Sequence, residues 1–457
     1  MSDRPAKPRR LQNPEQRKRA ATSTPQQRPP KPNEWYPPPL SKLEDTGLNK
    51  LNIADLVLKT IYFSGDMTGR AISETVKLPF NGVVDLVLEF LKREKFVEIR
   101  GGEGGFGEAA YRYTISSKGS EKAREAMERS QYSGPAPVTL DQYLDAMHAQ
   151  NRNRPPIHQP QLRGLMTNLV ISDEMLSKVG PAVNSGRSIF LYGPPGNGKT
   201  TIAERVGQMI LGDDLWIPYC MDIDGQVIQI FDSVNHELSE NPPTVKHSTG
   251  TVADPRWVCI KRPMIMVGGE LTMAGLDLVY DETNKFYEAP FQVKANGGMF
   301  LIDDFGRQQV RPVDLLNRWI VPLEKGVDFL TLNNGRKIEV PFFVLIIFST
   351  NLDPKDLVDE AFLRRIRHKI EVGNPTYDQF RRIFEIMCGV KRVPYDEKGL
   401  AYLLKKWYIN HDRDLRMVHP RDLLSQVIDI ASYLDVEPTM SNFELIDRAA
   451  ASYFVEL

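Results

Sequence analysis

Hydrophobic residues near the start of the chain follow two different spacings, and each spacing predicts its own kind of element. Apolar positions recur with helical spacing over residues 53–63, 69–78 and 83–91. Residues 96–100 and 111–115 then alternate as strands on either side of a glycine-rich turn. We therefore expect three helices followed by a β-hairpin.

This order of elements resembles a winged helix-turn-helix. In such folds the third helix enters the DNA major groove with basic or amide side chains. Here its polar positions include Asn81, Asp85 and Glu89, at a spacing that places them on one helical face. The turn of the hairpin carries Glu103 and Glu108, which would repel phosphates. We expect this module to dock an unidentified protein client, with nucleic acid as the less favoured alternative.

Composition sets the limits of this module. Residues 1–44 are rich in Pro, Gln and Arg and hold almost no aliphatic residues, so we expect a disordered basic tail. The winged-helix-like domain is placed at residues 45–131. A linker is expected over residues 132–160, before the next strongly apolar segments.

A phosphate-binding loop follows in the middle of the chain. An apolar strand at 188–192 runs into a glycine-rich loop and then into a helical pattern at 201–211. The residues of this Walker A loop and the start of its helix are Gly193, Pro194, Pro195, Gly196, Asn197, Gly198, Lys199, Thr200 and Thr201. The glycines allow backbone N–H groups to surround phosphate oxygens. Lys199 is expected to reach the β- and γ-phosphates of ATP, and Thr200 to ligate Mg²⁺.

Two further apolar strands end in polar side chains. The strand at 297–302 ends in Asp303 and Asp304, which suit the metal side of a phosphate site. The apolar run at 342–349 is followed by Asn351. We expect both to be buried strands of the same sheet.

The order of these motifs, together with the arginines that follow them, resembles the AAA+ ATPases. Residues 359–366 are similar to the arginine-finger segment of that family, with Arg365 as the first candidate and Arg364 as the second. Arg421, in the segment His419-Pro420-Arg421, resembles the sensor 2 arginine that faces the nucleotide from the lid.

The resemblance also implies roles for the strand-end residues. Asp303 would hold Mg²⁺, Asp304 would polarise the attacking water, and Asn351 would stand at the sensor 1 position. Most relatives have Glu where this chain has Asp304. Because Asp is one methylene shorter, slow hydrolysis by a nucleotide-controlled scaffold stays open as an alternative.

The fold class that the resemblance implies is α/β, with an ATPase core at residues 161–373 and a helical lid at 374–457. The core would contain a five-stranded parallel sheet. The lid is expected to hold helices at 377–387, 397–407, 421–434 and 442–454. Many such proteins are hexameric rings, since the arginine finger acts in trans, so a homo-oligomer is expected.

Insertions favour one branch of the family. A long segment separates the expected second strand, at 215–223, from the strand before Asp303. It reads as a short helix at 226–237 and hairpin-like stretches at 256–267 and 276–292. A further hairpin is expected at 328–340, around the Asn334-Gly335 turn. This layout resembles the MoxR-like, chaperone-type AAA+ ATPases, some of which are linked to pilus assembly.

Charge and composition narrow the functional classes. The net charge is −1, so the whole molecule has no general attraction to nucleic acid or anionic lipid. The three cysteines are far apart, and the longest apolar run is much shorter than a membrane span needs, so a cytoplasmic protein with no membrane insertion is expected. We predict an ATP-hydrolysing enzyme that remodels a protein client. The alternatives are a DNA-directed motor and the slow scaffold.

Overall fold

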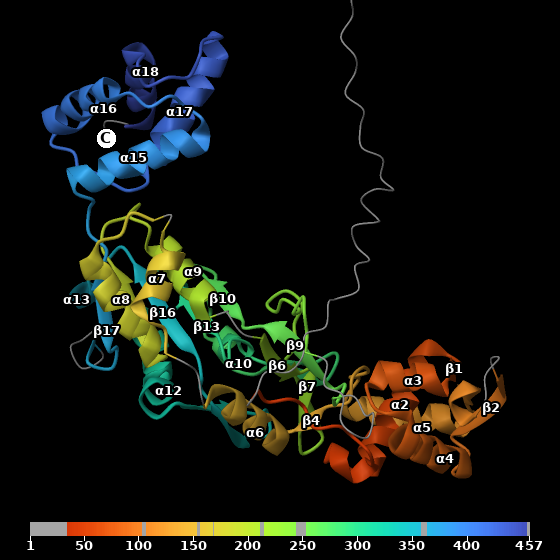
Figure 1. Ribbon diagram of the computed structural model, residues 1–457. Helices are drawn as coiled ribbons and strands as arrows, with labels where there is room; N and C mark the ends of the chain where they lie inside the picture. The colour runs from red at the N-terminus through yellow and green to blue at the C-terminus, as the bar shows by residue number, and fades with distance from the viewer. Residues whose placement is uncertain are drawn as a thin grey trace, which may run out of the picture.

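The computed structural model describes residues 34–102, 107–152, 156–167, 169–210, 214–243, 253–357 and 363–454. Figure 1 shows an elongated molecule with an N-terminal module at one end, a helical lid at the other, and two sheets between them. None of the described helices is long and apolar enough to cross a membrane.

Part of the segment expected as a disordered tail, residues 1–44, is ordered. Residues 1–33 lie outside the described part of the chain, but residues 34–44 are packed against the fold. Leu40 is buried in the core of the N-terminal module. Trp35 lies edge-on to Trp257, with ring centroids 5.1 Å apart. Because this segment is rich in proline, the sequence analysis did not predict that Leu40 and Trp35 would pack against the fold. Their packing stabilises an ordered conformation.

The N-terminal module contains the expected helices and hairpin. Its elements are α2 (Lys50–Ser64), β1 (Met67–Thr68), α3 (Gly69–Val76), α4 (Asp85–Arg93), β2 (Val97–Gly102), β3 (Tyr111–Ile115) and α5 (Ser117–Arg129). The strands form an antiparallel sheet in the order β1-β3-β2. Asn49 and Thr68 cap α2 and α3 by accepting hydrogen bonds from backbone N–H groups of the first turn.

Of the three polar residues expected on one face of the third helix, Asp85 and Glu89 share a face of α4, whereas Asn81 lies outside the helix. Helix α4 begins at Asp85, whose carboxylate accepts hydrogen bonds from the turn before it and from the helix start. Asn81 has extended backbone angles (φ −70°, ψ 128°), so it shares no helical face with Glu89. Of the two turn acids, Glu103 lies outside the described residues, and Glu108 starts a short 3-10 turn.

The segment expected as a linker, residues 132–160, is partly structured. It contains β4 (Val138–Thr139) and α6 (Leu140–Asn151), and α7 (Gln159–Leu165) begins at its end. Thr139 and Gln142 form a reciprocal capping box at the start of α6. Tyr143 of α6 is buried in the core of a second sheet, the one that contains β4.

The core has the predicted five-stranded parallel sheet. Its strand order is β10-β13-β16-β5-β17. The strands are β5 (Ser188–Tyr192), β10 (Met264–Val267), β13 (Met299–Ile302), β16 (Leu345–Thr350) and β17 (His368–Glu371). The three central strands, β13, β16 and β5, are buried on both faces because helices cover both. One face packs on α7, α8 (Asp173–Ser185) and α9 (Lys199–Ile210), and the other packs on α11 (Pro312–Arg318) and α12 (Ile320–Lys325).

The second strand of this sheet is not the one expected from the sequence. The segment 215–223 divides into β6 (Asp214–Pro218), which pairs with β9 (Trp257–Lys261), and β7 (Cys220–Ile223). Strand β7 forms a hairpin with β8 (Gln226–Gln229), where a helix was expected. The reason is the Asp224-Gly225 turn, in which both residues have positive φ. Such a two-residue turn matches the twist of a hairpin.

Strands β7 and β8 belong to a second sheet beside the core, in the order β11-β12-β8-β7-β4. Its hairpin β11 (Val279–Asp281) and β12 (Phe286–Glu288) lies within the expected stretch 276–292. The short helix α10 (Phe291–Lys294) leads back to the core. The hairpin predicted around Asn334-Gly335 is β14 (Val327–Thr331) and β15 (Lys337–Pro341).

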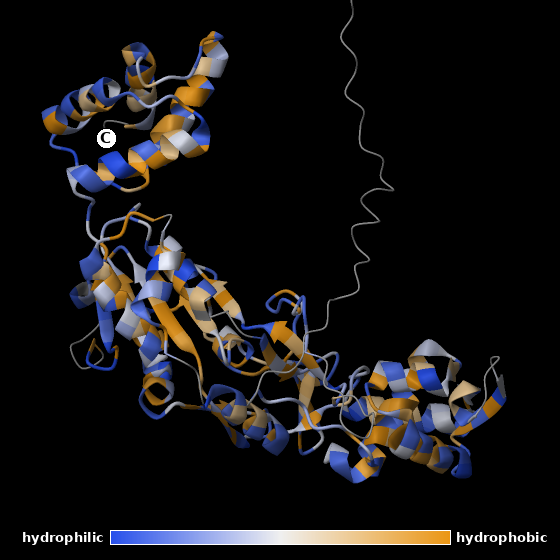
Figure 2. Ribbon diagram, viewed as in Figure 1, coloured by the Kyte–Doolittle hydropathy of each residue, from blue (hydrophilic) through white to orange (hydrophobic). Residues whose placement is uncertain are grey.

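The lid follows the parallel sheet after the short helix α13 (Pro354–Leu357) and β17. Its helices are α15 (Tyr377–Lys391), α16 (Glu397–Leu403), α17 (His419–Leu434) and α18 (Phe443–Tyr453), which match the four helical patterns in the sequence. They surround an apolar core that includes Phe380 and Phe384. In Figure 2, hydrophobic residues mark the strands of the parallel sheet.

Arg256 joins the N-terminal module to the second sheet. Its guanidinium is fully buried and donates to Asp254, to the carbonyl oxygen of Thr46 at 2.9 Å and to that of Pro137 at 2.8 Å. Removing one partner of a buried pair leaves the other charge without compensation. This one side chain therefore holds three separate segments together.

We expect Arg256→Leu to lower the free energy of unfolding by ~3–5 kcal/mol, because Asp254 would keep an unpaired buried charge. Calorimetric melting of the full chain measures this loss. Arg448→Ala removes an exposed arginine that pairs with Glu444 along α18, and serves as the matched control. Equal melting temperatures for the two variants would contradict the role assigned to Arg256.

Candidate functional site

The glycine-rich loop that the sequence predicts to bind phosphate, here called the phosphate-binding loop, connects β5 to α9 at the carboxyl edge of the parallel sheet. Gly193, Gly196 and Gly198 have φ values of 134°, 76° and 79°. Residues with a Cβ rarely adopt these angles, so the glycines let the loop turn its backbone toward a central point. Helix α9 begins at Lys199, which places a helix N-terminus at the same point.

Lys199 and Asn351 connect this loop to the next strands of the sheet. The Lys199 ammonium donates to the Asn351 Oδ1 at 2.6 Å and to the carbonyl oxygens of Gly193 and Pro194 at 3.0 and 2.9 Å. The Asn351 Nδ2 donates to the Asp304 Oδ1 at 3.2 Å. One amide therefore joins the lysine of the loop to a carboxylate of β13.

The second carboxylate meets the start of α9. The Thr200 hydroxyl donates to the Asp303 Oδ2 at 2.8 Å. Asp304, the next residue, has φ 48°, in the left-handed region that non-glycine residues seldom occupy. This turn sends the two adjacent carboxylates to different partners. Gln308 holds the turn by donating to the carbonyl oxygens of Asp303 and Asp304.

Burial alters the electrostatics of the lysine. Desolvation lowers the pKa of Lys199, while the carboxylates of Asp303 and Asp304 oppose that shift and Arg416 adds to it. The side chain is only 6% exposed. A cation held in a partly desolvated site between two carboxylates is well placed to bind an anionic ligand.

These residues fit a nucleotide and a magnesium ion. Thr200 and Asp303 supply the hard oxygen donors that Mg²⁺ prefers. Magnesium is commonly held by one or two protein groups together with substrate phosphates. No group of three or more His, Cys, Asp or Glu residues able to hold a metal lies in the described ranges, so substrate oxygens and water would have to complete the coordination.

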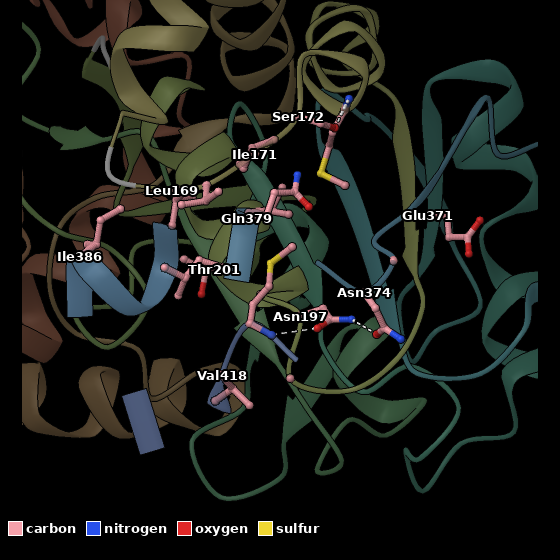
Figure 3. A pocket seen from close by; sticks show the side chains of 18 of the residues that line it. Leu169, Ile171, Ser172, Asn197, Thr201, Glu371, Asn374, Gln379, Ile386 and Val418 are labelled. Atoms are coloured by element: carbon pink, nitrogen blue, oxygen red, sulfur yellow. Dashed lines mark hydrogen bonds between the residues drawn. The ribbon is translucent and has the colours of Figure 1, made fainter. Parts of the chain in front are cut away.

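A cavity of about 540 Å³ opens beside the loop (Figure 3). Its walls come from the segment before α8, from α9, from the end of β17 and from the lid. Apolar side chains form much of the lining: Leu169, Ile171, Met175, Ile202, Ile383, Ile386 and Met387. Thr201 and Arg421 also line it. Its size and mixed character suit a ligand with a flat apolar group and a polar end.

The lid touches the phosphate-binding loop directly. Asn197 is fully buried, and its Nδ2 donates to the Asn374 Oδ1 at 2.8 Å, while its Oδ1 accepts from the backbone N–H of Met417 at 3.1 Å (Figure 3). The backbone N–H of Val418 donates to the Gly196 carbonyl oxygen at 2.8 Å. The sequence reasoning placed Asn197 among the phosphate-binding residues but missed its bonds to the lid.

Arg416 and Asn374 are further residues that sequence reasoning missed. Arg416 donates to the Asn374 Oδ1 at 2.5 Å and pairs with Asp414 at 3.0 Å. Asn374 follows closely on β17, a strand that the sequence analysis did not locate. Nothing in the spacing singles out Arg416 from the neighbouring arginines. Arg421, the expected lid arginine, lies at the cavity and bonds Asp422 at 2.7 Å.

The expected arginine-finger candidates lie in a second hollow, of about 480 Å³, that does not include the phosphate-binding loop. Its lining residues are Arg187, Leu323, Glu324, Arg364, Arg365 and Arg367. Arg365 bonds the Glu324 carboxylate at 2.6 Å. The structure therefore brings together Lys199, Thr200, Asp303, Asp304 and Asn351, and keeps Arg364 and Arg365 separate from them.

Comparison with known proteins gives a partial match. A family model described as a domain of unknown function, DUF8689, matches residues 376–452, which lie in the lid. No curated protein matches the chain. Among solved structures, NtrX from Brucella abortus in complex with ADP is 14% identical, with a TM-score of 0.38. The match covers 72% of this chain and 66% of NtrX, slightly under two thirds of that protein.

RuvB from Thermotoga maritima, described as a Holliday junction branch migration motor, is 12% identical, with a TM-score of 0.34. The match covers 70% of this chain and 72% of RuvB. Both overall likenesses are weak.

His419, at the start of α17 in the lid, is a buried histidine close to this site. Burial lowers its pKa to about 4, the cations Arg416 and Arg413 act in the same direction, and Asp422 opposes them. Its Nδ1 is 2.9 Å from the Tyr408 hydroxyl. Folding therefore favours the neutral imidazole.

We predict that the chain loses stability as the pH falls from 6.5 toward 4. An unfolded histidine, with a pKa near 6.5, takes up a proton in that range, whereas folded His419 does so only near 4. His419→Gln should flatten this part of the plot of melting temperature against pH. The exposed His411 gives the control variant, His411→Gln. An unchanged slope in His419→Gln would contradict the prediction.

Proposed function

We propose that this protein binds and hydrolyses ATP as an AAA+ ATPase. The observation that carries the proposal is the linked set around the phosphate-binding loop, in which Lys199 meets Asn351, Asn351 meets Asp304, and Thr200 meets Asp303. A glycine-rich backbone and a helix N-terminus lie at the same place. Phosphoryl transfer needs this combination of positive charge, metal ligands and a polarising carboxylate.

Each side chain then has a defined task. Lys199 holds the β- and γ-phosphates and neutralises their charge. Thr200 and Asp303 would hold Mg²⁺, which would supply charge neutralisation to the phosphates. Asp304 orients and polarises the water, with Asn351 fixing the carboxylate through its amide N–H. Since an aspartate reaches less far than a glutamate, turnover at the slow end of such enzymes is expected.

The cavity beside the loop accommodates the nucleoside part of ATP. Its apolar walls suit a purine base, and side chains of the lid form one of these walls. Burial of the base between the core and the lid gives nucleotide binding a way to bias the position of the lid.

For the cellular role, we propose remodelling of a protein client, as in the MoxR-like branch. Support comes from an apolar core that the N-terminal module shares with the second sheet. We interpret the module as a winged helix. Cys220 and Val227 of that sheet are buried in the module core, and Phe286 packs edge-on against Tyr132 at 5.6 Å. Motion of the inserted sheet would therefore carry the module with it.

A DNA-directed motor is the second candidate. The observation that favours it is the basic charge at the C-terminal end of α4. Lys92 and Arg93 are exposed in the last turn of α4. Binding to DNA that weakens steeply as salt rises would support this candidate over the protein client.

Assembly into a homo-oligomeric ring is also proposed. The arginine-lined hollow lies away from the protein's own phosphate-binding loop, so Arg365 or Arg364 would serve the nucleotide of a neighbouring copy. An anionic phosphate of that copy would replace Glu324 as the partner of Arg365. Ring size is taken as six from the resemblance.

The test of ATPase activity uses two variants. Lys199→Ala should abolish ATP binding, since it removes the ammonium that meets the phosphates. Asp304→Asn should keep ATP binding and lose hydrolysis, because an amide cannot polarise water while Thr200 and Asp303 still hold the metal. Equilibrium titration with ATP and phosphate release measure the two effects. Wild-type ATP affinity in Lys199→Ala would overturn the proposal.

Arg365→Ala should keep ATP binding and lower turnover by ~10³–10⁵, the usual effect of losing an arginine finger. Arg364→Ala should have a smaller effect. Mixing Arg365→Ala with Lys199→Ala should restore some phosphate release, because intact fingers then face intact loops in mixed rings. A mixture that stays inactive, although mixed oligomers form, would show that Arg365 does not act across a subunit boundary.

A further inference from the structure

The turn that follows β13 has an unusual backbone at Asp304. Its φ of 48° lies in the left-handed region, and its carboxylate meets the Asn351 amide at 3.2 Å. A residue with a Cβ stays in this region only where the surrounding contacts hold it there. Aspartate and asparagine tolerate the region better than most other residues. The contacts around the turn therefore decide where this carboxylate points.

The side chain of Gln308 bridges the turn through three hydrogen bonds to the main chain. Its Nε2 donates to the carbonyl oxygens of Asp303 at 2.9 Å and of Asp304 at 3.1 Å. Its Oε1 accepts from the backbone N–H of Gly306 at 2.8 Å. Because the two ends of the amide meet opposite kinds of partner, its orientation is fixed.

The residue after Asp304 is attached to the neighbouring strand β16. Phe305 is buried, and its backbone N–H donates to the carbonyl oxygen of Ser349 at 2.7 Å. The carbonyl oxygen of Phe305 accepts from the Thr350 hydroxyl at 2.7 Å. Strand β16 thus holds one side of Asp304, and the bonds of Gln308 to the two carbonyl oxygens hold the other.

We propose that Gln308 is a positioning residue for ATP hydrolysis, which maintains the left-handed turn that directs the Asp304 carboxylate toward Asn351 and the attacking water. This inference rests on the proposed function. It assigns the placement of the carboxylate to the backbone turn rather than to the length of the side chain. Polarisation of the water itself stays with Asp304.

The physical reason is the balance between backbone strain and hydrogen bonding. Without the Gln308 amide, two carbonyl oxygens lose a donor and the left-handed conformation of Asp304 loses its support. Relaxation of Asp304 to negative φ would turn its carboxylate away from Asn351. A glutamate at this position would reach further but would tolerate the left-handed conformation less well than aspartate does.

The main experiment separates turnover from nucleotide affinity in the full chain. Phosphate release at increasing ATP concentration gives kcat, and equilibrium titration with the non-hydrolysable analogue AMP-PNP gives the affinity. Gln308→Leu should lower kcat by about tenfold, the rate equivalent of one lost hydrogen bond. AMP-PNP affinity should change by less than about threefold, because Lys199 and Thr200 are untouched.

Two further variants show whether the donors of Gln308 matter. Gln308→Glu keeps the length of the side chain and an acceptor for the Gly306 N–H, but it cannot donate to the two carbonyl oxygens. It should lower kcat as much as Gln308→Leu does. Gln309→Leu changes the exposed neighbouring glutamine and should leave kcat unchanged. Melting temperatures check the fold of each variant, and Gln308→Glu keeps the test valid if Gln308→Leu is unstable.

Asp304→Glu tests the turn from the other side. If the length of the side chain set the rate, the longer carboxylate would raise kcat. If the left-handed turn sets it, glutamate should lower kcat by about threefold to tenfold, because the strained conformation becomes less favourable. A kcat equal to or above that of the unchanged chain would overturn the inference.

The outcomes distinguish this inference from the proposed function. An unchanged kcat in Gln308→Glu, while Asp304→Asn is inactive, would retain the ATPase and overturn the role of Gln308. An equal loss of kcat and of AMP-PNP affinity in Gln308→Glu would also overturn it, since that pattern indicates a general structural loss. AMP-PNP affinity unchanged in Lys199→Ala would overturn the proposed function itself.

Discussion

Parallel strands of one sheet all end at the same edge, and this constraint assembles the whole site. The phosphate-binding loop follows β5, Asp303 follows β13, Asn351 follows β16, and Asn374 comes shortly after β17. These residues are far apart in the chain, yet the register of the four strands brings their carboxyl ends together. The apolar burial that stabilises the sheet is therefore also what positions the polar groups.

The second sheet connects the N-terminal module to the rest of the protein. It shares an apolar core with the N-terminal module, and the buried Arg256 ties the same junction with hydrogen bonds to Thr46 and Pro137. In Figure 1 the module and this sheet lie together at the end of the molecule opposite the lid. The module and the second sheet are therefore joined by both apolar and polar contacts.

Much of the core could be predicted from the sequence because its signals are local and strong. The Gly193–Thr200 loop between a strand and a helix has few structural alternatives, and the apolar strand before Asp303 needs a buried place. The prediction of a central strand at 215–223 was wrong, because apolar residues alone do not distinguish a central parallel strand from a strand in an antiparallel pair. The Asp224-Gly225 turn carried the missing information. The contacts of Arg416 depend on tertiary placement and left no pattern.

One bond between the lid and the phosphate-binding loop is independent of side-chain identity. The Val418 N–H and the Gly196 carbonyl belong to the main chain, so exchanging residue 418 for any residue except proline leaves donor and acceptor in place. At Gly196 the case is different, because a Cβ there would approach the Val418 Cγ1 to 2.7 Å. Side chains of the lid loop can therefore change without loss of this contact, whereas position 196 is restricted to glycine by its positive φ and by the approach of Val418.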